Sequence, residues 1–231
     1  MSRAWTRSVL IALVLITAAC GDDSDGSNPQ APTTVTEREA PDTAPDTQSQ
    51  EQTEELAAIQ TALEFFEARN AWDGPATRAL VADEAQVADF AVEAPDDYLA
   101  MADLERTLQW QYLDPQCVAR ASDEMAHVRC SYVMQNRLSQ ATGTGPYRGS
   151  HIEFEISEGL IKTVVNTFEH GLYGPEVLEP FSEWLAANHP GDMDVMFFIN
   201  ESGDVNRSLS PGSLALWAER VPEYVAFRGG E

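Results

Sequence analysis

The residues of this 231-residue chain that could carry out chemistry are few and widely separated. Its four histidines have no paired spacing and no cysteine–histidine cluster beside them: His127, His151, His170 and His189. A zinc site needs converging nitrogen and sulfur ligands, so the sequence predicts no metal and no other cofactor. The Gly-x-Ser-x-Gly motif of many hydrolases and a glycine-rich phosphate loop are also absent from the sequence. General acid–base chemistry is the reaction type left to consider.

Cys117 and Cys130 form the clearest pairing of chemical groups in the sequence. Residues 117–121 and 126–134 alternate as two strands do, and the turn between them centres on residues 123 and 124. This centring places the two cysteines directly opposite each other on one face of a hairpin, where a disulfide bond fits. In an oxidising compartment we expect the bond to form; two buried free thiols are the alternative.

The third cysteine, Cys20, ends a short apolar segment. Residues 9–19 are apolar apart from Thr17, and Arg3 and Arg7 precede them. This run is too short to cross a bilayer, which takes about 20 apolar residues. The segment resembles a bacterial lipoprotein signal, with a charged start, an apolar middle and a small-residue cleavage site.

The resemblance to a lipoprotein signal implies a location. Residues 1–19 would be the signal peptide, and Cys20 would become the acylated first residue of the processed chain. The protein would then be lipid-anchored at the cell membrane and face outside the cytoplasm. An ordinary secretory signal that happens to end in a cysteine is the alternative.

The charge balance excludes some partners. The chain has 38 acidic and 14 basic residues, and its net charge is −24. Arg3 and Arg7 are the basic residues before position 20, so the processed chain would carry −26. Nucleic acid binding needs basic patches, and anionic lipid would repel such a chain. We therefore expect no nucleic acid partner, and membrane attachment through the acyl chains on Cys20.

Composition divides the rest of the chain into a tether and one domain. Residues 20–53 are rich in Asp, Ser, Thr, Pro, Gln and Glu and lack aromatic residues, which predicts a disordered acidic tether. Residues 54–231 are numerous enough for one domain with a sizeable core. Within it, residues 54–173 are expected to form the main fold, and residues 174–231 a C-terminal helical extension packed on the same domain.

Hydrophobic periodicity predicts helices first and strands later. Leu56, Ile59, Leu63 and Phe66 have helical spacing, which places Arg69 on another face of that helix. Asp73 is expected to cap a second helix that continues through residues 80 and 81, and a third covers residues 96–108. Further segments are expected as follows: a polar connection over 137–148, a hairpin of strands 151–156 and 161–170, a helix over 177–185, a strand over 193–198, and a last helix from Ser210 that Pro222 kinks or splits.

Two segments resemble a known family. Residues 57–70, Ala-Ala-Ile-Gln-Thr-Ala-Leu-Glu-Phe-Phe-Glu-Ala-Arg-Asn, are similar to the first helix of the SnoaL-like branch of the nuclear transport factor 2-like superfamily. Residues 150–165 resemble its central hairpin. The resemblance covers about residues 56–173 and implies an α+β fold: a cone-shaped, curved antiparallel sheet wrapped around N-terminal helices.

The family resemblance implies several chemistries, and fold alone does not choose among them. Isomerases and cyclases of this kind use a carboxylate base, usually Asp, beside a donor such as Tyr, but no Asp occurs between Asp123 and Asp192. A dehydratase-like site would pair His151 or His170 with Asp73 or Asp83. The alternatives are a surface role for His151, a strand-end position for His170 and a helix cap for Asp73. Glu153 and Glu155 could substitute for the Asp base of an isomerase or cyclase, but they lie on the strand face opposite the apolar residues, where a solvated or interface role is expected.

Three functional hypotheses follow. The first is non-catalytic binding of a small apolar ligand in the cone or of a protein partner. The second is an isomerase, cyclase or dehydratase. The third is self-association as a homodimer through the exposed sheet face, as in many relatives. Side chains that could line a pocket, or form the core instead, are Trp110, Tyr112, Tyr132, Met134, Phe154 and Phe168.

Overall fold

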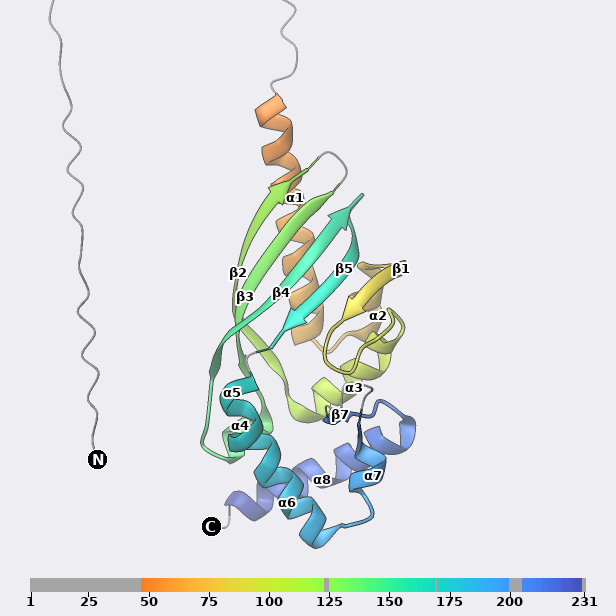
Figure 1. The fold of residues 1–231 in the computed structure, drawn as a ribbon, viewed down its shortest axis with the longest axis vertical. Coiled ribbons are helices and arrows are strands. Elements are labelled where there is room, and N and C mark those ends of the chain that lie inside the picture. The colour runs from red at the N-terminus through yellow and green to blue at the C-terminus, as the bar shows by residue number, and fades with distance from the viewer. Residues whose placement is uncertain (1–46, 123–124, 169, 200–204, 230–231) are drawn as a thin grey trace, which may run out of the picture. The chain divides into compact units, whose positions relative to one another are not determined.

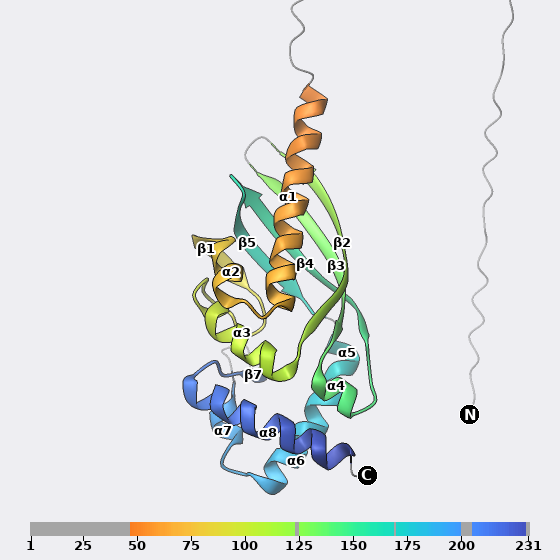
Figure 2. The ribbon, with the colours of Figure 1, turned by 180° about the vertical axis from the view of Figure 1, so that it is seen from behind.

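Five strands form one curved sheet, and helix α1 lies along one of its faces (Figures 1 and 2). The structure is a computed structural model that describes residues 47–122, 125–168, 170–199 and 205–229. The strand order is β1-β5-β4-β3-β2. The helix and strand bounds of this part are α1 (Thr47–Asn70), α2 (Gly74–Ala79), β1 (Val81–Ala88), α3 (Asp97–Leu108), β2 (Gln111–Ala121), β3 (Ala126–Gln135), α4 (Arg137–Ala141), β4 (Tyr147–Ser157) and β5 (Leu160–Thr167).

The architecture confirms the expected α+β class with a curved antiparallel sheet. Strands β2 to β5 pair antiparallel in chain order. Strand β1 was not expected and pairs parallel to β5 at the sheet edge. Residues 80 and 81 therefore do not continue the second helix: the carbonyl of Leu80 accepts a hydrogen bond from the amide of Ile161, and Val81 begins β1. Pairing with a neighbouring strand outweighs the weak helical pattern there.

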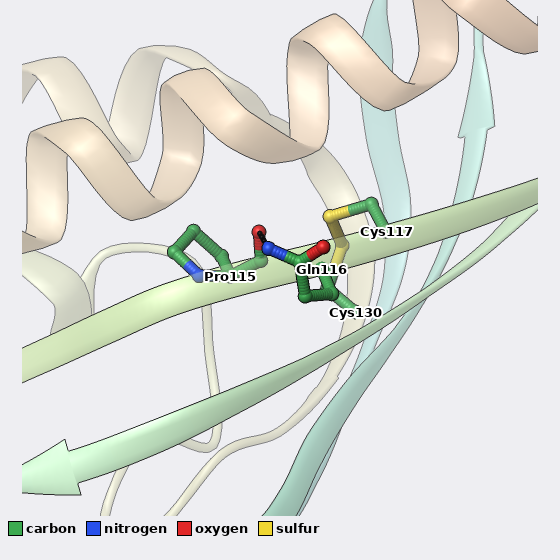
Figure 3. Close-up of a disulfide and its surroundings, with 4 residues drawn as sticks. All are labelled: Pro115, Gln116, Cys117 and Cys130. Atoms are coloured by element: carbon green, nitrogen blue, oxygen red, sulfur yellow. Dashed lines mark hydrogen bonds between the residues drawn. A yellow bond between two sulfur atoms is a disulfide. The ribbon is translucent and has the colours of Figure 1, made fainter.

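The β2–β3 hairpin carries the predicted disulfide. Cys117 and Cys130 lie directly opposite each other in the strand register and are joined by a disulfide bond. Figure 3 shows the bond on the side of the strands nearest the helix. Strand β2 is a sheet edge, and its register shifts between Leu113 and Gln116, where Pro115 interrupts the strand. Asp114 in this interruption has a left-handed φ of 50°.

Helix α1 buries Phe66 as predicted, and Ile59 packs partly buried against the core, but the rest of the buried face differs from the predicted one. Leu56 is 61% exposed, whereas Phe65 is fully buried and Arg69 is 2% exposed. The physical reason is close approach: Ala58 and Ala62 are buried, and small residues let the helix pack near the sheet. The first turns of α1 extend beyond the strands (Figure 1).

The C-terminal extension gathers at the end of the sheet opposite the start of α1 (Figures 1 and 2). Its elements are α5 (His170–Tyr173), a π-helical turn η1 (Gly174–Leu178), α6 (Glu179–Asn188), α7 (Met193–Met196), β6 (Phe197–Ile199), β7 (Val205–Arg207) and α8 (Pro211–Gly229). Buried aromatic rings hold these helices together: Phe181 stacks on Trp217 at 5.3 Å and meets Tyr224 edge-on at 5.2 Å between ring centroids.

Several boundary predictions are corrected in this half of the chain. Residues 137–148 contain helix α4, because Asn136 and Ser139 form a reciprocal capping box. Strand β5 ends at Thr167, so His170 begins a helix rather than ending a strand. The expected strand over 193–198 is mostly helix α7, and α8 is not split at Pro222.

Some predictions fall outside the described residues. The signal peptide of residues 1–19 and Cys20 are among them. Helix α1 begins at Thr47, so its first two turns lie within the segment 20–53 that composition assigned to the tether. None of the helices in the described ranges is both long and apolar enough to cross a membrane.

Candidate functional site

A guanidinium group lies in the interior between α1, α3 and the sheet. Arg69 Nη1 lies 2.6 Å from Asp89 Oδ2. Arg69 Nε donates to both carboxylate oxygens of Glu105 at 3.0 Å, and Nη2 donates to Oε1 of Glu105 at 2.5 Å. Nη2 also donates to the hydroxyl of Tyr112 at 2.5 Å. One buried cation thus serves two buried carboxylates, which are 1% and 0% exposed.

Neutral donors complete the hydrogen bonding of these two carboxylates. The hydroxyl of Tyr112 donates to Glu105 at 2.7 Å, and that of Tyr98 to Asp89 at 3.2 Å. Asn166 Nδ2 donates to Asp89 Oδ1 at 2.8 Å, while its own oxygen accepts from Tyr132 at 2.8 Å. We call this set the Arg69 cluster; it consists of Arg69, Asp89, Tyr98, Glu105, Tyr112, Tyr132 and Asn166.

Helical spacing explains how the cluster assembles. Arg69 follows Phe65 by one helical turn on α1, and both side chains are buried. Glu105 follows Tyr98 by two turns on α3, so it shares the buried face of that helix. Asp89 comes directly after β1, the strand that the sequence did not predict.

Electrostatics hold the cluster in one protonation pattern. Burial acts to lower the pKa of Arg69, but Asp89 and Glu105 outweigh it and raise that pKa well above its usual value. Burial raises the pKa of Glu105, and Arg69 opposes this. Burial also raises the pKa values of Tyr98 and Tyr112, so both remain neutral donors. The groups satisfy one another, which is the behaviour of a structural polar network.

Three recesses formed by the described residues lie away from this cluster. The largest of these three, of about 740 Å³, lies on the sheet face that points away from α1. A second, of about 390 Å³, lies between α1 and the tips of the two hairpins, and a third, of about 280 Å³, lies beside α2 and α3. No member of the Arg69 cluster lines any of the three.

Among the expected acid–base residues, Asp73 and His151 lie on separate elements and contact other groups. Asp73 caps α2, where its Oδ1 accepts from the amide of Ala76 at 2.9 Å. His151 lies on the opposite side of the sheet from α1, with Nε2 3.8 Å from Glu153 Oε1. The backbone of His170 begins α5, and its side chain is outside the described part. The helix-cap reading of Asp73 is confirmed.

The six candidate pocket residues are all buried in the core. Tyr112 and Tyr132 meet at 5.1 Å between ring centroids, and Phe154 meets Phe65 at 5.3 Å. Trp110 lies 6.1 Å from Phe168 and is fully buried, as is Met134. Phe154 is the member of the set that also borders the largest recess.

The largest recess belongs to an ordered grid of side chains that we call the outer face. Its central row crosses β2, β3, β4 and β5 as Val118, Arg129, Glu153 and Val165. The row beside it consists of Arg120, His127, Glu155 and Thr163, and the row on the other side consists of Gln116, Ser131, His151 and Thr167.

Contacts within the outer face link its two middle strands. Arg129 Nη1 lies 3.2 Å from Glu153 Oε1, and His127 Nδ1 lies 3.6 Å from Glu155 Oε1. At the two ends of the central row, Val118 is 68% and Val165 is 38% exposed. The outer face therefore carries paired charges flanked by exposed apolar side chains.

Sequence reasoning missed Arg69, Asp89 and Glu105. The carboxylates that the sequence suggested for an isomerase lie in a hairpin strand. Glu105, in contrast, lies on α3, and Asp89 directly follows β1. A usable signal existed: Glu105 lies in register with the apolar stripe of Tyr98 and Met101. Arg69 likewise lies in register with Phe65 and Phe66.

Neither a protein-family model nor a curated protein sequence matches this chain. Similar solved structures include a proposed polyketide cyclase from Pseudomonas putida KT2440. Its sequence is 19% identical, the alignment covers 51% of this chain and 95% of that protein, and the TM-score is 0.39. A protein of unknown function from Mycobacterium tuberculosis has 9% identity, coverage of 80% and 95%, and a TM-score of 0.43.

A third similar structure is a Nostoc punctiforme protein of unknown function with a cystatin-like fold. It has 11% identity, coverage of 48% of this chain and 87% of that one, and a TM-score of 0.38. At these identities and TM-scores the likeness does not extend to activity, so membership of the SnoaL-like branch stays a prediction.

Proposed function

We propose that this protein is a lipid-anchored extracytoplasmic module that acts by binding protein through its outer face, without catalysis. The partner in this proposal is a second copy of the chain. The observation that carries it is the self-complementary order of the outer face, Val118–Arg129–Glu153–Val165 across four strands. Membrane attachment is through acyl chains on Cys20.

The filled interior supports binding at the surface over chemistry or a small ligand in the cone. The acid–base groups of the Arg69 cluster donate to and accept from one another, and both carboxylates are buried. A general acid or base must reach a substrate proton, within hydrogen-bond distance or through one water. The candidate pocket residues fill the space beside the cluster with ring contacts such as Tyr112–Tyr132.

Geometry makes the outer face complementary to itself. A twofold axis parallel to the strands and between β3 and β4 would bring β3 of one copy over β4 of the other. Arg129 would then face the Glu153 of a second copy, and Val118 would face its Val165. The contact would bury exposed apolar side chains at both edges and alternate charges at the centre, which suits a specific interface.

Charge also favours this face over the rest of the surface. The whole chain carries −24, so two copies repel each other in general. The central row of the outer face and the row that contains Arg120 together hold two arginines and two glutamates. These charges balance locally: Arg120, Arg129, Glu153 and Glu155.

Sedimentation velocity tests the association. The protein would be the processed chain with Cys20→Ser, which removes the acylation site. We expect a concentration-dependent dimer, and Arg129→Glu should abolish it by opposing like charges across the axis. Combining Arg129→Glu with Glu153→Arg should restore it, because the alternation is rebuilt with the signs exchanged.

Arg106→Glu is the matched control for this charge reversal. Arg106 is as exposed as Arg129, each side chain at 58%, but lies on α3 away from the outer face. The proposal would be wrong if the chain stayed monomeric at every concentration. It would also be wrong if Arg106→Glu disrupted the dimer as strongly as Arg129→Glu.

Anchoring needs its own experiment. The unmodified chain should incorporate labelled fatty acid in a bacterial host and partition into detergent phase, and Cys20→Ser should lose both properties. Label retained in the Cys20→Ser protein would place the modification elsewhere and contradict this part of the proposal.

A further inference from the structure

Aromatic rings gather where the cone meets the C-terminal extension. Trp110 follows α3 and is fully buried. Its ring centroid lies 5.9 Å from that of Tyr173 in α5 and 6.1 Å from that of Phe168. Phe90 packs on Trp110 at 5.4 Å and on Phe168 at 5.2 Å. These contacts hold the Trp110 ring in one position.

A cation from the extension lies on this ring. The guanidinium carbon of Arg207, on β7, is 5.6 Å from the centroid of Trp110, within the range of a cation–π contact. Arg207 also lies near the hydroxyl of Tyr173: burial raises the pKa of that hydroxyl, and the positive charge of Arg207 opposes the rise. That hydroxyl accepts a hydrogen bond of 2.7 Å from Asn136 Nδ2.

Two N–H groups at the contact between Arg207 and Trp110 have no hydrogen-bond partner in the described part of the chain. In the ranges that the structure describes, Arg207 forms no ion pair with a carboxylate, and its Nε is buried without a hydrogen-bond partner. Trp110 Nε1 is likewise buried without a partner there. Buried donors are normally satisfied, so two unsatisfied donors in one contact need an explanation.

We propose that the face of Trp110 and the hydroxyl of Tyr173 form a binding site for a guanidinium-bearing ligand, which Arg207 occupies in cis in this structure. Arg207 is only partly buried, so the site borders solvent once this side chain leaves. The strongly negative chain draws cations toward it. This site is independent of the outer face, because its residues come from α5, β7 and the connection between α3 and β2.

Arg207→Ala should empty the site, and methylguanidinium at millimolar concentration is the probe. We expect the variant to melt at a lower temperature than the wild-type chain and to recover in a saturable manner as methylguanidinium is added. The indole N–H resonance of Trp110 should shift along the same curve. The wild-type chain should show neither change, because its own side chain fills the site at a high effective concentration.

Methylurea is the matched control ligand, since it has nearly the same shape without the charge. Arg220→Ala is the control variant: Arg220 lies in the same extension but pairs with Asp192 at 2.7 Å. The Trp110 resonance should not respond to methylguanidinium in that variant. Equal effects of methylurea and methylguanidinium, or no saturable effect on Arg207→Ala, would show that the contact is packing only.

A second pair of variants keeps the proposal testable if Arg207→Ala does not fold. Arg207→Lys retains a cation, whereas Arg207→Gln has similar length and no charge. If the site recognises cations, the Lys variant should keep the chemical shift of the Trp110 indole N–H closer to the wild-type value than the Gln variant does. Its melting temperature should also be closer to that of the wild-type chain. Equal behaviour of the two variants would overturn the proposal.

Discussion

Arg69 and Arg207 each contact aromatic rings, and their surroundings differ in almost every other respect. Arg69 is 2% exposed, lies 5.0–5.5 Å from the centroids of Phe65, Tyr98 and Tyr112, and pairs with two carboxylates. Arg207 is partly exposed, lies over Trp110, and has a buried Nε without a partner in the described residues.

The difference separates a cation that belongs to the fold from one that another cation could replace. Removing one member of a buried ion network leaves the others uncompensated in a medium that solvates them poorly. Removing a cation that lies over a ring and forms no ion pair among the described residues leaves no buried carboxylate uncompensated there. The following predictions test this contrast, from the largest expected effect to the smallest.

Arg69→Met should cost about 3–5 kcal/mol of unfolding free energy, because Asp89 and Glu105 would remain buried without their cation. Urea denaturation followed by near-ultraviolet circular dichroism would measure the loss. Arg106→Met, at an exposed position, should change stability by no more than about 0.5 kcal/mol. Similar losses in the two variants would mean that the cluster is not a structural network.

Glu105→Gln should have a smaller effect than Arg69→Met, because Asp89 still balances Arg69, and it should change the pH dependence of stability. The pKa of Glu105 is raised in the folded state, so the folded chain binds this proton more tightly than the unfolded chain. The resulting stabilisation is complete below about pH 4.5, the usual pKa of the group, and declines as pH rises through the raised value.

The measurement for Glu105 is the wild-type minus Glu105→Gln difference in unfolding free energy between pH 4 and pH 8. This difference should fall as pH rises, whatever other groups contribute in both proteins. A difference that grows with pH would show that the carboxylate is stabilised in its charged form, and the direction given above would be wrong.

Arg207→Met should cost no more than about 2 kcal/mol, because it loses a cation–π contact but keeps the apolar stem. The same urea titration measures it beside Arg69→Met. The contrast between the two arginines would disappear if the two substitutions destabilised the protein equally.

Tyr132→Phe should have the smallest effect, about 1 kcal/mol. It removes the hydroxyl that donates to Asn166, while Asn166 keeps its bond to Asp89. Thermal unfolding of the variant beside the wild-type chain would measure the difference. A loss as large as that of Arg69→Met would mean that Tyr132 supports the carboxylates more directly than its contacts indicate.

The sheet was more predictable than the site because strand patterns are local. Alternation of Ile152, Phe154 and Ile156 with glutamates identified β4, and the cysteine spacing set the register of β2 on β3. Strand β1 could not be found in this way, because its pairing with β5 depends on residues nearly eighty positions away.

The Arg69 cluster was missed because charged residues were assumed to lie outside apolar stripes. That assumption is usually sound, since unpaired burial of a charge is unfavourable. It fails where several elements each contribute one polar group to the same place, as α1 and α3 do here through Arg69 and Glu105. Only the assembled fold shows that the charges compensate one another.

The interruption of strand β2 has a consequence for how copies of the chain assemble. A regular edge strand can accept a further strand and extend without limit into a fibre. Here Pro115 lacks an amide hydrogen, and the register shift from Leu113 to Gln116 breaks the row of backbone groups at the edge. Growth by edge-to-edge addition is blocked at that point. A contact through the sheet face about a twofold axis closes at two copies, so this strand favours a finite assembly over polymerisation.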